Sequence, residues 1–354
     1  MLKIAVLPGD DIGPEVVPEC VKVMKSAAAK AGLEVQWTEL PIGRKGHELH
    51  GHTMPQQTVE ALMKVDGWVL GPTGHGSYPR NDPTWVFPPL RKRFDLYASI
   101  KPVRSYANIE SIHKNVDIVF LREVSEGMQS SDTVVAGSGE FRPNDSITIA
   151  SRVITRDGSH RVAREAFEIA RMRPRRKVTS VHKEPMYRLA CGMFADECRK
   201  LAREYPDVEF DEVLVDGFAM KLVMKPQQYD VVVTTNQFGD ILTDEGAGLV
   251  GGLGLAPGLC VGERQAMAQA THGSAPDIAG KNVANPYALI VSGKMLFDWL
   301  GRRRNEPRAV EAARRIEAAV DRVITEAKHL TRDLAGEAST TEMGDAIAAA
   351  VQAG

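Results

Sequence analysis

The segment DVVVTTNQFGDILTDE, residues 230–245, determines the fold class that the sequence predicts. Its apolar run, residues 230–235, has the length of a buried strand, and the polar turn after it leads into helical spacing. In α/β proteins, ligands bind beyond the carboxyl ends of such strands. Asp240 and Asp244 then stand on one face of the helix, one turn apart.

The acidic pair Asp240 and Asp244 allows two interpretations. Two like charges at this spacing repel unless a cation bridges them, and Mg²⁺ and Mn²⁺ prefer such hard carboxylate oxygens. The alternative is a pair of exposed acids near a helix N-terminus, where the helix dipole favours negative charge. The pair alone is compatible with both, so the motifs around it decide.

Further apolar runs alternate with helical stretches, and this alternation predicts an α/β fold with a largely parallel sheet. The expected strands are residues 2–7, 67–70, 116–121, 177–181 and 230–235, and the expected helices include residues 14–31 and 307–331. Residues 133–136 and 146–154 are β-rich and are separated by turn residues, which indicates a hairpin or arm.

The composition is that of an ordinary globular enzyme. The 354 residues include 43% apolar and 25% charged residues with a net charge of −2, so nothing indicates a nucleic-acid or membrane partner. The chain also lacks an apolar stretch of the roughly 20 residues that a membrane span needs. The four cysteines have no zinc-ligand spacing and fit free thiols in a reducing cytosol. We therefore expect a soluble, cytoplasmic protein.

A second candidate site is the segment THGSAPDIAGKNVANP, residues 271–286. Its glycines, prolines and small polar residues predict a surface loop and not a strand or helix. The backbone N–H groups and His272 suit phosphates or an adenine ring, and Asp277 suits ribose hydroxyls. Because no GxGxxG follows the first strand, the common dinucleotide-binding fingerprint is absent.

Seven motifs follow one another along nearly the whole chain. They are GDDIGPEV (9–16), LRK with DLYA (90–98), LRE (121–123), VHK (181–183), VD (215–216), the stretch 236–244 and the stretch 272–286. In this order they resemble the β-decarboxylating dehydrogenases, a family that includes isopropylmalate, isocitrate, homoisocitrate, tartrate and D-malate dehydrogenases.

The resemblance implies a two-domain fold of the isopropylmalate/isocitrate dehydrogenase type, without a Rossmann dinucleotide-binding fold. One domain would combine residues 1–98 and 253–354 and bind the cofactor. The other, residues 99–252, would carry the metal and substrate site, form a homodimer and extend a β arm near residues 130–155.

The implied activity is the NAD-dependent, divalent-metal-dependent oxidative decarboxylation of a malate-type 2-hydroxy diacid. A hydride leaves C2 to the cofactor, and the resulting keto acid loses CO₂. Mg²⁺ or Mn²⁺ would bind Asp216, Asp240 and Asp244, and Lys183 would be the general base. The two active sites of the dimer would be shared, with Lys183 and Asp216 coming from the partner subunit.

The resemblance also implies how substrate and cofactor are bound. Arginine suits a malate carboxylate because a planar guanidinium pairs with it bidentately. The expected substrate contacts are Arg91, Lys101, Arg122, Thr84, Phe87 and Gln129. The expected NAD contacts are His272, Gly273, Ser274, Ala275, Asp277 and Asn285. Asp277 favours NAD⁺ because an acid repels the 2′-phosphate of NADP⁺.

Six residues depart from the family pattern, and two of them, Gln269 and Asp11, are expected only to adjust cofactor placement. Lys101 stands where a third substrate arginine is usual, and Gln129 stands where a proton-donating tyrosine is usual. Trp85 and Phe87 replace the serine and asparagine that hold the third carboxylate of isocitrate, and a carboxylate left unpartnered there costs on the order of a few kcal/mol. An isopropylmalate-, tartrate- or D-malate-like substrate is therefore favoured over isocitrate. Lys101 and Gln129 also leave open dehydrogenation without prompt decarboxylation, or a catalytically weakened binding or regulatory homologue.

Overall fold

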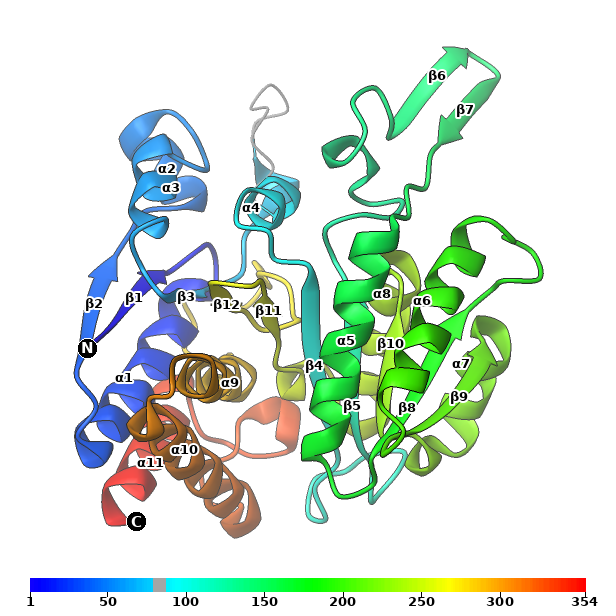
Figure 1. Ribbon diagram of the computed structural model, residues 1–354. Coiled ribbons are helices and arrows are strands. Elements are labelled where there is room, and N and C mark those ends of the chain that lie inside the picture. Colours follow the sequence, from blue (N-terminus) through cyan, green and yellow to red (C-terminus); the bar gives the residue numbers. More distant parts are fainter. Residues whose placement is uncertain (79–86) are drawn as a thin grey trace. The chain divides into compact units, whose positions relative to one another are not determined.

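The computed structural model describes residues 1–78 and 87–354. They form two compact units. Unit 1 comprises Met1–Val86, Tyr106–Ser111 and Gly251–Gly354, and unit 2 comprises Phe87–Ser105 and Ile112–Val250. Each unit has its own strands and its own helices (Figure 1). The C-terminal third of the chain thus returns to the N-terminal unit.

Unit 1 is built on five strands in the order β2-β1-β3-β12-β11. They are β1 (Leu2–Leu7), β2 (Val35–Glu39), β3 (Gly67–Leu70), β11 (Leu259–Val261) and β12 (Ala266–Ala268). All neighbouring pairs are parallel except β11 and β12. The helices are α1 (Gly13–Ala31), α2 (Gly43–His50), α3 (Gln56–Leu62), α9 (Tyr287–Arg304), α10 (Pro307–Glu326) and α11 (Thr340–Ala353). Single 3₁₀ turns lie at His75–Ser77, Leu253–Leu255 and Arg332–Leu334.

Helix α1 shows how the sequence sets an element of unit 1. Pro14 lies in the first turn, where its missing N–H costs nothing, and Gly32 ends the helix with φ of +64°. Spacing of three and four residues produces one buried face, which comprises Val16, Val17, Cys20, Val23, Met24 and Ala27. This face packs α1 against α9, α10 and α11.

Unit 2 is built on five strands in the order β4-β5-β10-β8-β9. They are β4 (Ala98–Arg104), β5 (Asp117–Glu123), β8 (Lys177–His182), β9 (Glu209–Leu214) and β10 (Val231–Thr234). Only β4 and β5 are antiparallel. The helices are α4 (Phe87–Arg93), α5 (Arg156–Met172), α6 (Ala190–Glu204), α7 (Val215–Met224) and α8 (Asn236–Val250). Single 3₁₀ turns lie at Ser131–Thr133 and Pro226–Gln228.

The five strands predicted from apolar runs are confirmed. Residues 2–7 and 67–70 form β1 and β3 with the predicted ends, and β5, β8 and β10 differ from prediction by one or two residues at their ends. The largely parallel pairing is confirmed as well. In unit 2, Phe120 from β5, Phe218 from α7 and Leu242 from α8 share one buried cluster.

Two predictions are wrong, one about the end of a helix and one about a strand. The helix expected over residues 307–331 ends at Glu326, because Ala327 takes a left-handed conformation with φ of +56° and closes the helix onto the carbonyl of Val323. Residues 133–136 form no strand, because the Thr133 hydroxyl donates to the Ser130 carbonyl at 2.7 Å and stabilises a turn.

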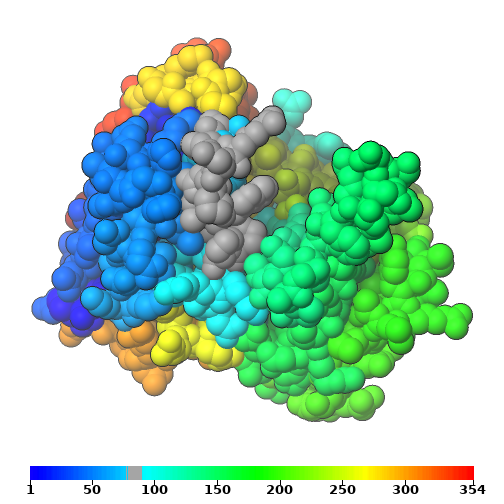
Figure 2. All heavy atoms as spheres, turned by 90° about the horizontal axis from the view of Figure 1, so that it is seen from above, coloured from blue at the N-terminus to red at the C-terminus, as the bar shows by residue number. Residues whose placement is uncertain are grey.

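The predicted β arm is a hairpin of unit 2 that projects from its helices (Figure 1). It pairs β6 (Glu140–Asn144) with β7 (Ile147–Ala150). All residues of both strands are exposed, and the arm forms part of the surface in Figure 2. Among residues 1–78 and 87–354, no helix has the length and apolarity required to cross a bilayer.

Residues 87–98 lie in unit 2, although the sequence-based division grouped them with the N-terminal residues. The reason is local pairing: the Tyr97 carbonyl accepts a hydrogen bond from the Val124 amide at 3.1 Å, and Arg161 lies over the Tyr97 ring. This placement brings α4 and β4 to the same unit as α8, which carries the acidic pair.

Candidate active site

The acidic pair lies in the second and third turns of α8, directly after β10. Desolvation alone would raise the pKa of Asp240, but the charge of Arg122 and a hydrogen bond from Gln129 hold that pKa below its usual value. Partial desolvation raises the pKa of Asp244, against the charge of Lys101, and the negative charge of Asp240 adds to the rise. The carboxylates therefore interact, as their helical spacing requires.

Arg122, at the end of β5, is the centre of the polar network around Asp240. Its guanidinium forms an ion pair with Asp240 and donates to the Asn236 amide oxygen from Nε at 3.1 Å and from Nη2 at 2.7 Å. Arg122 Nη2 also donates to Gln129 Oε1 at 2.7 Å, and Gln129 Nε2 donates to Asp240 Oδ2 at 2.9 Å. Gly239 gives the arginine its room, since a Cβ there would lie 2.7 Å from Arg122 Cγ.

Lys101, on β4, is a buried cation beside the same helix. Only 9% of the residue is exposed, and its Nζ donates to the Thr243 hydroxyl at 3.0 Å. Burial, with the positive charge of Arg122, lowers the pKa of Lys101 to about 8, although Asp244 and Asp240 oppose the shift. Arg91, from α4, also contributes to the lowering. Unit 2 therefore brings three predicted substrate cations near the two acids.

Lys183 and Asp216 form a separate pair within the chain. Lys183 Nζ donates to Asp216 Oδ1 at 2.6 Å, and this hydrogen bond lowers the pKa of Asp216. Within the part of the chain that the structure describes, no three acidic, histidine or cysteine side chains cluster as a metal site. Asp216 of the same chain is thus not brought to Asp240 and Asp244, and its contribution through a partner subunit stays a prediction.

The predicted cofactor loop, residues 271–286, belongs to unit 1 and joins β12 to α9. It contains no helix or strand, and Asp277 is exposed at its surface. His272 Nδ1 donates to the Gly273 carbonyl at 3.0 Å, whereas His272 Nε2 is buried and has no hydrogen-bond partner. Burial lowers the pKa of His272, so its imidazole is neutral and Nε2 is an acceptor.

The loop is held against the start of α1. The Glu15 carboxylate accepts hydrogen bonds from the backbone amides of Gly280 and, at 2.9 Å, Asn282. The Ile12 amide donates to the Ser274 carbonyl at 3.2 Å. These contacts hold residues 274–282 at both ends. Ala275, within this segment, has a φ of +45°.

Asn285 has a structural use in the same loop. Its Nδ2 donates to Asp333 Oδ2 at 2.9 Å, and its Oδ1 accepts from the Tyr287 amide at 2.9 Å, where α9 begins.

Of the predicted substrate residues, Thr84 lies outside the described residues, as does the neighbouring Trp85. Phe87 begins α4, but its side chain is not among those that the structure describes.

Sequence reasoning missed two groups of residues around the site. Asn236 and Gly239 could have been noticed, because both lie in the first turn of α8, just after β10. The second group is the buried acid pair Glu123 and Glu126: burial and the charge of Glu123 raise the pKa of Glu126 to about 7. Glu126 accepts from the Thr155 hydroxyl at 2.6 Å and amide at 2.9 Å, a partner 29 residues away that no local pattern indicates.

Comparison with known proteins agrees with this arrangement. The isocitrate/isopropylmalate dehydrogenase family profile matches residues 3–347. The chain is 38% identical to the 3-isopropylmalate dehydrogenase of Archaeoglobus fulgidus over 348 residues, which covers 98% of this chain and 99% of that protein. It is 37% identical to the isocitrate/homoisocitrate dehydrogenase of Thermus thermophilus over 357 residues, with 99% and 98% covered.

A solved structure is similar throughout. The crystal structure of isocitrate dehydrogenase from Methylococcus capsulatus matches with a TM-score of 0.87 at 38% identity and covers 99% of this chain and 100% of that chain. The predicted resemblance and the absence of a Rossmann fold are therefore supported by sequence and structure together. The chain belongs to the isocitrate/isopropylmalate dehydrogenase family.

Proposed function

We propose that the protein catalyses the NAD⁺- and divalent-metal-dependent oxidative decarboxylation of a malate-type 2-hydroxy diacid. The observation that carries the proposal is the meeting of Arg91, Lys101 and Arg122 with Asp240 and Asp244 in unit 2. Three cations suit a substrate with two carboxylates, and two acids on one helix face suit a divalent cation. Relatives described as 3-isopropylmalate dehydrogenase and isocitrate/homoisocitrate dehydrogenase are named for the oxidation of 2-hydroxy acids.

The carboxylate pair fits the proposed metal. The interaction with Asp240 contributes to the raised pKa of Asp244, and a divalent cation relieves that repulsion. Asp240 and Asp244 would hold the cation with Asp216 of the partner subunit. When bound, Mg²⁺ or Mn²⁺ supplies Lewis acidity at the substrate C2 oxygen. The Arg122–Asp240 pair would then separate, which frees the guanidinium for a substrate carboxylate.

Lys183 is the proposed general base. Deprotonated Nζ would accept the proton of the C2 hydroxyl while the hydride leaves C2 to NAD⁺. The lysine now donates to Asp216, and this contact sets where the amine lies relative to a metal-binding carboxylate. Arg91, Lys101 and Arg122 orient the diacid so that its C2–H faces the cofactor.

The cofactor loop fits an adenine nucleotide. His272 Nε2 is a buried acceptor without a partner, and the amino group of adenine is a donor that satisfies it. Asp277 is exposed and negative, which suits a ribose diol and disfavours a 2′-phosphate. NAD⁺ is therefore the proposed cofactor in preference to NADP⁺.

An activity panel tests the proposal. Purified protein with Mn²⁺ is assayed for NADH formation from D-malate, tartrate, isopropylmalate and isocitrate. We expect turnover with one of the first three, because Trp85 and Phe87 replace the isocitrate-binding pattern. Reduction of neither NAD⁺ nor NADP⁺ by any of the four would contradict the proposal.

Metal binding tests the acidic pair independently. Asp244→Asn is expected to weaken Mn²⁺ binding, measured by titration calorimetry, at least about tenfold, because one of the hard anionic ligands is lost. Asp145→Asn, on the exposed turn of the arm, is the matched control and is expected to bind as the unaltered protein does. Equal affinities for the two variants would remove Asp244 from the site.

Gln129 supports a second candidate, dehydrogenation without prompt decarboxylation. An amide is no general acid near neutral pH, and both ends of this one are engaged, by Arg122 and Asp240. The ratio of CO₂ released to NADH formed separates the candidates. A ratio near one favours the decarboxylase, and a ratio well below one favours release of the keto acid.

A further inference from the structure

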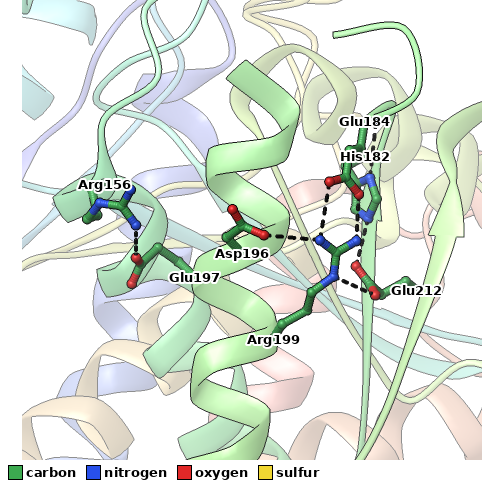
Figure 3. A network of polar contacts seen from close by, with 7 residues as sticks. All are labelled: Arg156, His182, Glu184, Asp196, Glu197, Arg199 and Glu212. Carbon is green, nitrogen blue, oxygen red and sulfur yellow. Dashed lines mark hydrogen bonds and ion pairs between the residues drawn. The ribbon is translucent and has the colours of Figure 1, made fainter. Parts of the chain in front are cut away.

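His182 and Glu184, the two residues that flank Lys183, are linked to one arginine, Glu184 directly and His182 through Glu212 (Figure 3). Arg199, on α6, pairs with Glu184 through Nη2 at 2.5 Å and Nη1 at 3.2 Å. Its Nε donates to Glu212 on β9 at 3.0 Å. Glu212 in turn contacts His182, the residue before Lys183. The four residues His182, Glu184, Arg199 and Glu212 form what we name the Lys183 bracket.

The geometry assigns one hydrogen-bonding role to each ring nitrogen of His182. The residue ends β8 and is 3% exposed. Its Nδ1 accepts a hydrogen bond from the Glu184 amide at 3.3 Å, so the proton lies on Nε2, which donates to Glu212 Oε1 at 3.0 Å. The imidazole therefore bridges the backbone just after Lys183 and the side chain of the neighbouring strand.

The bracket lies at the carboxyl ends of β8 and β9, the strands that precede Lys183 and Asp216. Strands β8 and β9 are parallel neighbours, with His182 opposite Leu214. Lys183 follows the first strand directly, and Asp216 lies two residues after the second. A link between the strand ends therefore fixes the relative position of the lysine and the acid, whose Nζ and Oδ1 are 2.6 Å apart.

Stability is an insufficient reason for this network. The side chains of Arg199, Glu184 and Glu212 are each exposed by about a third, at 35%, 31% and 29%. Ion pairs at such positions contribute little to the free energy of unfolding, because water screens the charges and the long side chains lose freedom. A planar guanidinium that contacts carboxylates from two elements instead supplies defined geometry.

We propose that the Lys183 bracket positions Lys183 for proton transfer, with Arg199 as the positioning residue. This inference rests on the proposed function and adds residues that the proposed chemistry does not itself require. A lysine has four rotatable side-chain bonds, so a base of this type needs its backbone and its partner fixed. Arg199 does not touch the substrate in this proposal and acts only through the residues on either side of Lys183.

The opposite face of α6 provides a matched control. Glu197 is 3% exposed and pairs with Arg156 at 2.5 Å and with His160 at 3.1 Å. Figure 3 shows this pair across the helix from Arg199. Arg156→Gln therefore breaks an ion pair of the same helix without touching the Lys183 bracket.

The experiment compares Arg199→Gln with Arg156→Gln in the full chain. We expect Arg199→Gln to lower kcat about tenfold while KM for the diacid stays within about twofold, since misplacement affects the reacting group and not substrate binding. Arg156→Gln is expected to leave both constants unchanged. Arg199→Lys should recover part of kcat, because a lysine can form again the contact with either Glu184 or Glu212.

A second readout does not depend on turnover. The rate at which limiting acetic anhydride acetylates Lys183, measured by peptide mass spectrometry, is expected to rise several-fold in Arg199→Gln and not in Arg156→Gln. Glu212→Gln, which keeps an acceptor for His182 but loses the charge opposite Arg199, should give an intermediate rate. Thermal unfolding of each variant shows whether it is folded.

The outcomes separate the two proposals. If the unaltered protein has no dehydrogenase activity, the proposed function fails, and the acetylation rates still decide the bracket. An Arg199→Gln variant that acetylates Lys183 at the unaltered rate overturns the bracket. So does an equal effect of Arg199→Gln and Arg156→Gln on kcat, because it would reflect only a general loss of helix stability.

Discussion

Lys101 is a predicted substrate contact whose burial should make the free energy of unfolding depend on pH. Its pKa is lowered to about 8 from 10.5, so between these values the unfolded chain binds more protons than the folded protein does. The free energy of unfolding should therefore rise with pH across this window. In metal-free protein, we compare the free energy of unfolding of the unaltered chain with that of Lys101→Met. The value for the unaltered chain minus that for the variant should increase by on the order of 2 kcal/mol from about pH 7 to about pH 10. Denaturant titrations measure it.

Lys177→Met is the control for this prediction. A hydrogen bond to Glu209 raises the pKa of Lys177, so its contribution to stability is present below the unfolded pKa and is lost only as the pH rises through the folded pKa. No gain in stability between about pH 7 and about pH 10 is expected from it. If the difference in the free energy of unfolding between the unaltered chain and Lys101→Met did not change with pH, folding would not lower the pKa of Lys101.

Asp277 is the residue from which cofactor preference is predicted. Asp277→Lys places a positive charge where a 2′-phosphate would lie, and the ratio of kcat/KM for NADP⁺ to that for NAD⁺ should rise at least about tenfold. Asp277→Asn removes only the repulsion and should give a smaller rise. Steady-state kinetics with both cofactors decide, and an unchanged ratio in Asp277→Lys would place the ribose elsewhere.

Glu15 shows how one element can hold another. From the first turn of α1, its carboxylate accepts from the amides of Gly280 and Asn282 and so anchors the cofactor loop. Charge-assisted hydrogen bonds of this kind contribute more than neutral ones, so we expect Glu15→Ala to raise KM for NAD⁺ about tenfold. KM for the diacid should be unaffected. Glu34→Ala, exposed just after the same helix, is the control; equal KM values for NAD⁺ would contradict the anchoring role.

Elements were predictable from the sequence where local pattern alone decides them. The apolar runs of β1 and β3 set both ends of each strand, because a buried strand between turn residues has no competing structure. The end of α10 was not predictable, since Ala327 is a good helix former and only the folded chain holds it at a positive φ. The turn at Ser131–Thr133 likewise depends on a hydroxyl contact with the backbone.

The candidate site follows the same division. Its residue types could be predicted, because Arg122, Lys183 and Asp240 occur in recognisable motifs at strand ends and helix starts. Their supporting contacts could not be. Arg199 meets Glu212 across 13 residues, and Gly239 makes room for a side chain of another strand. Such contacts arise from the pairing of strands and have no signal in spacing.

At the scale of the whole molecule, unit 2 carries several large apolar side chains that are exposed. The exposed fractions of Met186, Leu189, Met220 and Met224 are 71%, 89%, 56% and 62%, and Phe141 and Ile147 of the arm are each 49% exposed. Exposed apolar side chains are typical of an interface where they lie together in one patch. A homodimer stays a prediction, which light scattering on the purified protein tests directly.

Sharing of the active sites makes a stronger prediction than dimerisation does. Lys183→Met and Asp240→Asn should each abolish turnover, because one removes the proposed base and the other a proposed metal ligand. If each site takes Lys183 and Asp216 from one subunit and Asp240 and Asp244 from the other, a mixed dimer of the two variants has one intact site. Unfolding and refolding equal amounts together gives heterodimers in half of the molecules, so the mixture should recover about a quarter of the unaltered activity. Sites confined to single subunits would recover none, because every site in the mixture would then lack either Lys183 or Asp240.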